Sequence, residues 1–513
     1  MPDPSAALDE PAPGRWSPWA LAGVVLAVLV GVVARFVATS PLWLDEALSV
    51  NIAGLPLGDI GPALAKDGHP PLYYWLLHGW MALFGDGDVA VRSMSGVVSL
   101  ATLPLAWWAG RRLAGRAGGR WAVVLLALSP YAARYATEAR MYALVMFLVT
   151  AGYLLLGNVL RSPRVWSGGL LALTAGALLW THYWSVYLLA ATGLVLLWRW
   201  WRRPEGRTGT TLALVALVAG ALSLVPWMGT FLEQAAHTGT PWALPSRPTQ
   251  ILDVTLDDLG GGGFAEASLY GTLIVVLVLL AGFARRTARG TVELGSGLVA
   301  SVRDEVVVVV ATLLLAWAAG LLTDSAYASR YAAVVVPLVL LVAACGLTRL
   351  RSGWLLWGLG ATAVALGVVA TAHNVSSPRT QAEELAGTIA AGSGPADVVV
   401  ACPDQLGPSL VRAVRRTYHL DLPVVPYPRD GDPRFVDWRD YAERNAAADP
   451  AAFADEILER AGQGTIWVVW NGTYRTLMGQ CEDVIDRLSA SRPATIVTTA
   501  NDAFEPANLF RFG

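Results

Sequence analysis

Long apolar stretches separated by short polar connections follow one another from Trp19 to Ala372. A helix that crosses a bilayer needs about 20 predominantly apolar residues. With that window the pattern predicts about eleven spanning helices, at Trp19–Thr39, Val89–Ala109, Trp121–Tyr135, Met141–Leu160, Val165–Thr181, Tyr183–Trp201, Thr211–Phe231, Leu269–Phe283, Val306–Leu322, Tyr331–Leu347 and Trp354–Ala372. The third stretch is short and contains Pro130, so its place in the series needs independent support.

The arginines provide that support, because cytoplasmic loops carry an excess of Lys and Arg. If the N-terminus is cytoplasmic, the inner loops contain Arg111, Arg112, Arg116, Arg120, Arg161, Arg164, Arg199, Arg202, Arg203, Arg207, Arg285, Arg286, Arg289, Arg303, Arg349 and Arg351. The outer loops are poor in arginine and richer in carboxylates. Leaving out the third helix would scatter the arginines over both sides. We therefore expect a multi-pass protein with a cytoplasmic N-terminus and an extracytoplasmic C-terminus.

The composition agrees with a membrane protein. The chain is 55% hydrophobic and 15% charged, whereas a soluble domain carries roughly 25% charged residues. The 37 basic residues nearly balance the 39 acidic ones. The sequence shows no concentrated basic face of the kind that would indicate nucleic acid as a partner.

The pattern changes near Val375, where apolar runs shorten to strand length. Buried strands are predicted at Val398–Ala401, Val424–Tyr427, Ile466–Asn471 and Thr495–Thr499, with helices at Leu406–Arg416, Pro450–Ala461 and Tyr474–Leu488. Their alternation indicates a parallel or mixed α/β domain. The expected organisation is a disordered cytoplasmic tail (1–15), a helical membrane domain (16–374) and an extracytoplasmic α/β domain (375–513).

The three cysteines differ in their surroundings. Cys345 lies in an apolar run, where a buried thiol is expected. Cys402 and Cys481 both belong to the C-terminal region. They can form a disulfide if that region lies outside the cytoplasm, although the sequence does not show that they meet.

Charged residues collect at the predicted outer ends of the helices, where such groups are costly and mark functional sites. Asp45 and Glu46 follow the first helix, beside Trp43. Partial burial there would bring a carboxylate toward the range of a general base. The alternative is that Asp45 caps a short helix at Glu46–Ala53.

Further along the same loop, Lys66 and His69 precede a Pro-Pro pair and then Tyr73 and Tyr74. Because a helix can begin after the prolines, His69 would lie at a helix N-terminus, which favours anions. An interfacial turn with aromatic residues explains the same pattern.

Three outer arginines, Arg134, Arg140 and Arg330, defy the charge bias, and such arginines are candidates for phosphate binding. Arg140 precedes the fourth helix and Arg330 begins the tenth, next to Tyr331. Glu138 lies near Arg140, and its alternative role is a helical ion pair with Arg134. His182 and Tyr183 occupy a tight outer turn, where a structural histidine is the common case.

Together these segments resemble the GT-C glycosyltransferases, in particular the bacterial branch that groups protein mannosyltransferases with the lipid A aminoarabinose transferase. The likeness lies in Leu42–Ala47, Gly68–Tyr74, Phe84–Asp86, Thr137–Tyr142, Thr181–Tyr183 and Ser329–Tyr331, in this order. The C-terminal region has no comparable likeness.

The resemblance implies an enzyme of the bacterial plasma membrane that uses a polyprenyl-phosphate-linked sugar at the outer face. It implies a general base at Asp45, a supporting carboxylate at Glu46 and a donor-phosphate ligand at Arg330. Arg140, His69 and Lys66 would join the phosphate site. Substrate contacts would come from Glu138, Tyr73, Tyr74, His182, Tyr183 and Tyr331.

The implied reaction is an inverting displacement at the anomeric carbon. It requires no metal or other cofactor, because arginines can neutralise a departing phosphate. Binding of a divalent cation by Asp45 and Glu46 is an open alternative, since hard cations bind carboxylates. The expected partners are the lipid-linked donor, the bilayer and a glycan, lipid or protein acceptor of the cell envelope.

Mannose is the favoured sugar, with arabinofuranose or another pentose as the alternative. Trp438, Trp467 and Trp470 could stack on acceptor glycan, although core packing is favoured for the two strand tryptophans. A lipid-linked sugar flippase is the main competing function, but transporters show repeats and midplane polar residues that this sequence lacks. An assembly subunit that only anchors a glycan-binding domain is a third possibility.

Overall fold

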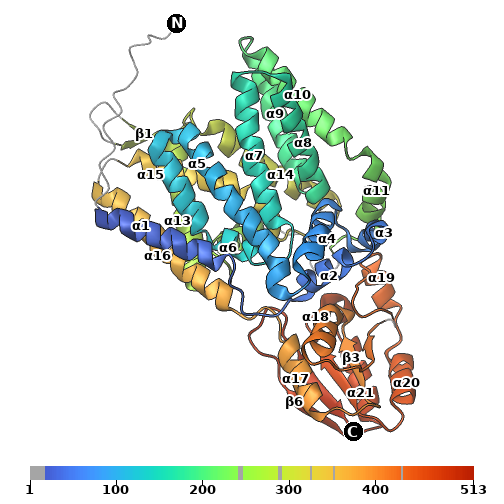
Figure 1. The fold of residues 1–513 in the computed structure, drawn as a ribbon. Coiled ribbons are helices and arrows are strands. Elements are labelled where there is room, and N and C mark those ends of the chain that lie inside the picture. Colours follow the sequence, from blue (N-terminus) through green and yellow to red (C-terminus); the bar gives the residue numbers. More distant parts are fainter. Residues whose placement is uncertain (1–17, 241–246, 287–291, 324–325, 351–352, 429–430) are drawn as a thin grey trace.

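The computed structural model describes residues 18–240, 247–286, 292–323, 326–350, 353–428 and 431–513. Long helices form one body, and the C-terminal elements form an α/β domain at one end of it (Figure 1). This arrangement confirms the predicted fold class. The predicted tail at residues 1–15 lies outside the described residues.

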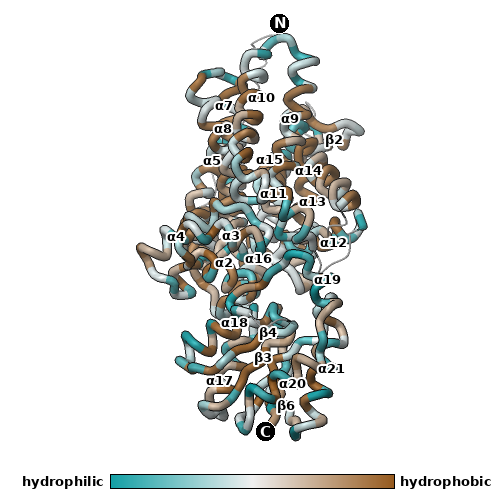
Figure 2. The backbone as a smooth tube through the Cα atoms, turned by 90° about the vertical axis from the view of Figure 1, so that its right-hand side faces the viewer, coloured by the Kyte–Doolittle hydropathy of each residue, from teal (hydrophilic) through white to brown (hydrophobic). Residues whose placement is uncertain are grey.

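The helical body is built from α1 (Pro18–Ala34), α5 (Asp88–Ala127), α7 (Tyr142–Arg161), α8 (Val165–Thr181), α9 (Ser185–Arg202), α10 (Arg207–Leu222), α13 (Ala265–Phe283), α14 (Arg303–Leu322), α15 (Val336–Arg349) and α16 (Gly353–Ser376). Every predicted spanning stretch overlaps one of these helices. Within the described residues, 6 helical segments are long and apolar enough to cross a membrane. The bundle is largely hydrophobic along its helices, and hydrophilic residues mark its far end at the α9–α10 connection (Figure 2).

Two predicted helices are interrupted near prolines, which lack the backbone N–H that a helix interior needs. The stretch Thr211–Phe231 ends as α10 at Leu222, and a 3₁₀ turn containing Pro226 separates it from α11 (Met228–His237). The stretch beginning at Tyr331 starts as a 3₁₀ turn, η3 (Ser329–Val334). Helix α15 then begins at Val336, with Pro337 in its first turn, where the missing N–H costs little.

Helix α5 contains both the second and most of the third predicted stretch. Its backbone leaves helical geometry at Ala114 and Gly115, where the glycine has a positive φ of 66°. A Cβ atom on Gly110 would lie 2.6 Å from the carbonyl oxygen of Gly118, so the two halves of α5 pack against each other as a hairpin. The third predicted stretch, Trp121–Tyr135, therefore forms the second half of this hairpin and continues into the short α6 (Pro130–Ala136).

Short helices lie at the end of the bundle that faces the C-terminal domain. They are α2 (Leu44–Ala53), α3 (Leu57–Asp67) and α4 (Leu72–Phe84), with α12 (Pro248–Leu259) further along the chain. In Figure 1, α2, α3 and α4 lie between the long helices and the C-terminal domain. A small hairpin of β1 (Ala284–Arg286) and β2 (Val292–Leu294) follows α13.

The C-terminal domain has a five-stranded sheet in the order β4-β3-β5-β7-β6. Its strands are β3 (Val398–Cys402), β4 (Val424–Pro426), β5 (Ile466–Trp470), β6 (Ala494–Thr498) and β7 (Asn508–Phe512). The pairs β3–β4 and β3–β5 are parallel, whereas β7 is antiparallel to both neighbours, so the sheet is mixed. Helices α17 (Ala382–Gly392) and α18 (Gly407–Arg412) pack on one face, and α20 (Pro450–Ala461) and α21 (Gln480–Ser489) pack on the other. The short α19 (Tyr441–Ala446) lies in the β4–β5 connection.

Three details of this domain differ from the sequence prediction. The strand predicted as buried at Thr495–Thr499 is the edge strand β6, whose residues are mostly exposed. The predicted helix from Tyr474 begins only at Gln480, after a 3₁₀ turn. Strand β7 and helix α17 were not predicted, because their apolar residues are interspersed with charged and small ones.

Ion pairs attach the domain to the bundle. Arg412 lies 2.6 Å from the carboxylate of Asp88, at the start of α5. Arg416 pairs with Asp86, in the connection between α4 and α5. The Phe84–Asp86 segment singled out in the sequence is thus part of the domain interface.

Candidate active site

A cavity of about 500 Å³ lies where the helical body meets the C-terminal domain, and we call it the junction cavity. The helical body lines it with Trp43, Asp45, Asp67, His69, Arg140, Tyr327, Arg330 and Tyr331. The C-terminal domain lines it with Gln405, Trp438, Asn471, Thr473, Tyr474, Arg475, Thr476 and Phe504. Residues more than 400 positions apart in the sequence therefore share one polar site.

Asp45 lies in the first turn of α2, which begins at Leu44 with Trp43 at its N-cap. The capping alternative is wrong, because no side chain caps this helix. The Oδ2 atom of Asp45 lies 3.8 Å from Nη2 of Arg140 and 3.7 Å from Nη1 of Arg330. This oxygen is buried and accepts no hydrogen bond from the described residues. A carboxylate oxygen held between two cations without a committed donor is available to a substrate hydroxyl.

Glu46 has a different environment, although it is the next residue. It is fully buried, accepts two hydrogen bonds from Arg92 at 2.7 and 2.6 Å, and accepts the Ala139 N–H at 2.9 Å. Arg379 lies 3.8 Å away. Burial alone would raise the pKa of Glu46, but the paired arginine lowers it below its ordinary value. Glu46 holds α2 in place and does not line the junction cavity, so the two carboxylates do not form a shared cation site.

His69 lies between Asp67 and Arg140 and is hydrogen-bonded to both. Its Nε2 atom lies 3.0 Å from Nη2 of Arg140, which can only donate, so Nε2 accepts. Its Nδ1 atom, 2.8 Å from Asp67, therefore carries the proton and donates. Tyr74 donates to the same carboxylate at 2.9 Å. Both ring nitrogens of His69 are occupied, so it orients Arg140 instead of offering a free donor to phosphate.

Arg140 is also fixed by neighbours that are not charged. Its Nη1 atom donates to the Ser49 hydroxyl at 3.0 Å, and the side chain is 3% exposed. The guanidinium of Arg330 lies over the ring of Tyr331, with 5.8 Å between Cζ and the ring centroid. The Nε atoms of both arginines are buried and have no hydrogen-bond partner among the described residues. Two preorganised cations with unused donors suit a bound phosphate.

A second cavity of about 320 Å³, mostly aromatic and apolar, borders the junction cavity. Both cavities are lined by His69 and Tyr331, and the second one continues along Tyr187 on α9 and Trp317 and Leu321 on α14. We call it the aromatic cavity. It provides an apolar passage from the polar site into the helical body.

The turn with His182 and Tyr183 lines the aromatic cavity. His182 lies 5.4 Å from Tyr331, ring centroid to ring centroid, and accepts the backbone N–H of Trp184. Tyr183 donates to Gln234 and accepts from Trp227. These two residues thus contact the site from its apolar side.

Four other predicted site residues do not line the junction cavity. Glu138 is buried and accepts the indole N–H of Trp43 at 2.8 Å, and burial raises its pKa. The expected pairing of Glu138 with Arg134 is absent from the ion pairs of the described residues, because α6 ends at Ala136 and helical spacing is lost. Tyr73 and Tyr74 are buried beneath the site, and Lys66 lines another cavity behind α3.

The C-terminal domain contributes the carboxyl ends of its parallel strands. Pro403–Leu406 follows β3 and Asn471–Thr476 follows β5, and both segments reach the junction cavity. The chain leaves β3 for β4 on one side and returns to β5 on the other, so these two strands flank a topological switch point. In open α/β sheets, ligands bind outside the carboxyl ends of the strands at such a point. The carboxyl ends of β3 and β5, where such sheets bind ligands, therefore lie at the same cavity as Asp45.

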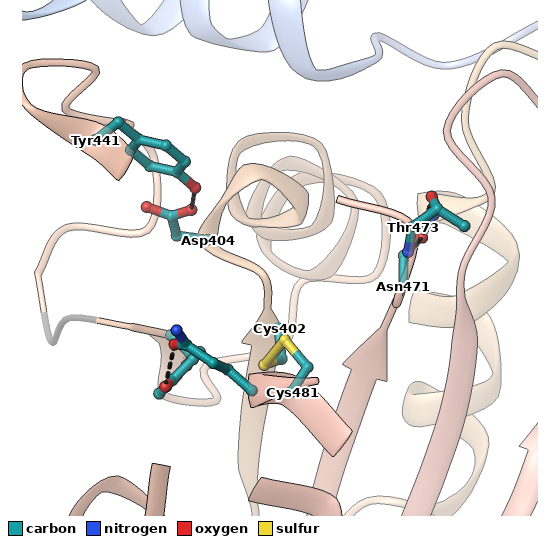
Figure 3. Close-up of a disulfide and its surroundings, with 8 residues drawn as sticks. Cys402, Asp404, Tyr441, Asn471, Thr473 and Cys481 are labelled. Carbon is teal, nitrogen blue, oxygen red and sulfur yellow. Dashed lines mark hydrogen bonds between the residues drawn. A yellow bond between two sulfur atoms is a disulfide. The ribbon is translucent and has the colours of Figure 1, made fainter. Parts of the chain in front are cut away.

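A disulfide braces this edge. Cys402, the last residue of β3, is bonded to Cys481 of α21 (Figure 3). The Asn471 amide donates to the carbonyl of Pro506, and its Oδ1 accepts from the backbone and hydroxyl of Thr473. Cys345 is buried in α15 and is not disulfide-bonded.

The three tryptophans of the domain have different positions. Trp467 is buried and donates to Asp397, and Trp470 packs on Phe510 within the sheet. Trp438 is the one of the three that lines the junction cavity, with its ring centroid 5.0 Å from that of Tyr441.

Two carboxyl groups near this edge have strongly raised pKa values because they are buried. Burial raises the pKa of Asp404, which accepts a hydrogen bond from Tyr441 (Figure 3), to about 7. Burial raises the pKa of Glu505 to about 8, and neither of its oxygens has a hydrogen-bond partner among the described residues. Asp67, Arg92, Arg379 and the loop after β5 were missed in the sequence. Only the loop has a local signal, namely its place after a parallel strand.

Comparison with known proteins agrees with this architecture. The crystal structure of ArnT from Cupriavidus metallidurans bound to undecaprenyl phosphate matches with a TM-score of 0.56 and 13% identity, over 96% of this chain and 98% of that one. The apo ArnT structure matches equally, with a TM-score of 0.56 and coverages of 96% and 97%. The apo oligosaccharyltransferase of Archaeoglobus fulgidus matches with a TM-score of 0.51 and 11% identity, over 91% of this chain and 72% of that one. No curated protein sequence matches the chain.

The chain thus has the GT-C fold, the fold of membrane glycosyltransferases, and the resemblance inferred from the sequence is confirmed. In sequence, residues 68–227 match the model of the dolichyl-phosphate-mannose-protein mannosyltransferase family. That segment contains His69 and Arg140 and ends before Arg330 and the C-terminal domain.

Proposed function

We propose that this protein transfers a sugar from a polyprenyl-phosphate donor to a cell-envelope acceptor, with Asp45 as general base. One observation carries the proposal. The unbonded Oδ2 atom of Asp45 faces two arginines in a polar cavity that continues into an apolar one. A lipid-linked sugar phosphate needs this combination, because its chain stays in the bilayer while its sugar reacts at the surface.

In the proposed reaction, Asp45 accepts the proton of an acceptor hydroxyl as that oxygen bonds to the anomeric carbon. The bond between the anomeric carbon and the phosphate oxygen breaks, and its electron pair leaves with the polyprenyl phosphate. Arg330 and Arg140 stabilise the charge that develops on this phosphate. Direct displacement inverts the anomeric configuration. The step needs no metal, because the two guanidinium groups neutralise the leaving group.

The similar proteins support the choice of donor. The matched ArnT structure holds undecaprenyl phosphate, and the matched family is that of dolichyl-phosphate-mannose-protein mannosyltransferases. We propose mannose as the sugar, and arabinofuranose or another pentose as the alternative. The site would face the outside of a bacterial plasma membrane, with the N-terminus in the cytoplasm, as the arginine distribution predicts.

We further propose that the acceptor binds to the C-terminal wall of the junction cavity. This wall offers hydroxyl, amide and aromatic groups from Gln405, Trp438, Thr473 and Tyr474. Neutral hydrogen-bonding groups beside aromatic faces suit a glycan with free hydroxyls. Its location at the switch point of the sheet supports the same assignment.

The test is sugar transfer from purified polyprenyl-phosphate mannose to an envelope extract. We compare wild type, Asp45→Asn and the control Asp59→Asn, which removes an exposed aspartate from the neighbouring helix α3. Loss of transfer by about 10²–10⁴-fold in Asp45→Asn alone, with unchanged thermal unfolding, would support the proposed base. Transfer that survives in Asp45→Asn would refute it. Failure of wild type with both hexose and pentose donors would favour the flippase.

A further inference from the structure

A separate cavity of about 320 Å³ lies at the other end of the bundle, among α7, α8, α9 and α14. Its walls are mainly aliphatic, with Val149, Leu156, Leu178, Leu188, Val195 and Val308 among them. It shares no lining residue with the junction cavity or the aromatic cavity. We call it the inner cavity, because its charged lining residues lie at the arginine-rich end predicted to face the cytoplasm, and we call this charged end the mouth.

The inner cavity is elongated along the helices. From Leu188 to Arg199, its wall on α9 extends for about 16 Å at the rise of an α-helix. This is about half of the 30 Å hydrocarbon core of a bilayer. The cavity therefore has the depth of one membrane leaflet, with an apolar interior and a charged mouth.

Two arginines at the mouth have no acidic partner in the described part of the chain. Nη1 and Nη2 of Arg112 donate to the Leu154 carbonyl and the Asn158 side chain at 2.7 Å each, and Nε of Arg161 donates to the Gly157 carbonyl at 2.9 Å. Neither forms an ion pair with a carboxylate of the described residues. A Cβ atom built on Gly157 would lie 3.2 Å from Nη2 of Arg161 and 3.7 Å from Nη1 of Arg112, so the two guanidinium groups converge.

The carboxylates at the same mouth already have partners. Asp304 pairs with Arg199 at 3.0 Å, and Glu305 accepts the Tyr153 hydroxyl at 2.9 Å. Glu305 keeps its charge, because a tyrosine hydroxyl is neutral. Three arginines (Arg112, Arg161 and Arg199) and two carboxylates line this cavity, so its net charge is positive. Two adjacent guanidinium groups above an apolar cavity are complementary to a phosphate attached to a hydrocarbon chain.

We propose that the inner cavity binds one chain of an anionic phospholipid, with its phosphodiester against Arg112 and Arg161. Basic pockets between transmembrane helices on the cytoplasmic side bind such head groups. The lipid would fill the space between α7 and α14 and stabilise the folded protein by mass action. This site is distinct from the proposed donor site at the opposite end of the bundle.

The experiment uses the full chain, purified in detergent and washed free of lipid. Native mass spectrometry measures binding of phosphatidylglycerol and of phosphatidylethanolamine with the same acyl chains. The test variants are Arg112→Gln/Arg161→Gln and Gly152→Leu, which narrows the cavity without changing charge. The charge-matched control is Arg111→Gln/Arg116→Gln, which removes two exposed arginines from the same end but outside the cavity.

We expect wild type and the control to bind phosphatidylglycerol about ten times more tightly than phosphatidylethanolamine. Both lipids offer a phosphodiester, but the ammonium group of ethanolamine is repelled by the two guanidinium groups, and one like-charge contact of about 1.4 kcal/mol corresponds to this factor. Both test variants should lose this binding. Phosphatidylglycerol should raise the unfolding temperature of wild type and of the control, but not that of the test variants. Equal binding by wild type and Gly152→Leu would overturn the proposal, as would equal loss in the control. Displacement of phosphatidylglycerol by equimolar polyprenyl phosphate would also overturn it, in favour of a second substrate-lipid site.

Discussion

Glu46→Gln would remove one negative charge from a buried cluster that contains Arg92 and Arg379. The carboxylate accepts hydrogen bonds at 2.6, 2.7 and 2.9 Å, and an amide can supply only one of the two acceptor oxygens. Its NH₂ group would face an N–H donor of Arg92. Removing one partner of such a buried pair costs about 3–5 kcal/mol. At about 1.4 kcal/mol per tenfold change, the folding equilibrium falls by between two and four orders of magnitude.

Asp45→Asn should behave in the opposite way, because Oδ2 of Asp45 accepts no hydrogen bond and its arginines lie 3.7 and 3.8 Å away. We expect a smaller loss of stability than in Glu46→Gln, because no hydrogen bond to Oδ2 is removed. The assay combines thermal unfolding of purified protein with sugar transfer per folded molecule. Glu46→Gln should unfold at a lower temperature but keep its turnover, whereas Asp45→Asn should lose turnover and keep more of its stability.

A Glu46→Gln variant that unfolded like wild type and still lost transfer would refute the structural role of Glu46, because Glu46 would then act in the chemistry. A double variant, Glu46→Gln/Arg92→Gln, provides the internal control. It removes both charges of the pair, and we expect it to recover part of the lost stability. If the losses of stability caused by Glu46→Gln and Arg92→Gln simply added up in the double variant, the contact between Glu46 and Arg92 would be contradicted.

Four further predictions concern other parts of the site. Because the pKa of Glu505 is raised from 4.5 to about 8, folding stability should fall by up to about 1.4 kcal/mol per pH unit between these values as pH rises, and Glu505→Gln should flatten this dependence in denaturant unfolding. Cys402→Ser/Cys481→Ser opens a loop of 79 residues, worth about 4.5 kcal/mol in a chain-entropy model, so limited proteolysis should cut the C-terminal domain faster. Arg330→Gln should lower kcat/KM for the donor by about 10²–10³, with only partial recovery in Arg330→Lys, because lysine lacks the planar fork. Trp438→Ala should raise KM for the acceptor but not for the donor, and unchanged acceptor kinetics would remove its stacking role.

The sequence was sufficient for the membrane helices because their signal is local. Length and hydropathy located the apolar stretches, and the arginine pattern supported the third one despite Pro130. The breaks at Pro226 and near Pro337 were not predicted, because the apolar window continues through both prolines, although proline chemistry accounts for them. Strand β6 was misjudged because alternation and β-branched residues do not distinguish an edge strand from a central one.

The candidate site was only partly predictable. The residues alone indicated that Asp45 and Glu46 matter, and the resemblance implied Asp45 as base and Glu46 as its support. The local sequence did not indicate which of the two lines the cavity, since successive helical residues point in different directions. Their partners decide this, and Arg92 and Arg379 are 46 and 333 positions from Glu46. The residues of the C-terminal wall are ordinary polar types. Only the order of strands, which depends on long-range pairing, brings them to the cavity.

One wall of the junction cavity belongs to the helical body and the other to the C-terminal domain, so the two walls can vary independently. The donor side is built into helices whose packing limits substitution. The acceptor side consists of loops at strand ends, which tolerate changes in length and sequence while the sheet stays intact. If the C-terminal wall binds the acceptor as proposed, changes in Pro403–Leu406 and Asn471–Thr476 would alter the choice of acceptor while the helical wall keeps its residues. Exchange of this domain between proteins of the same fold would then change the glycan product.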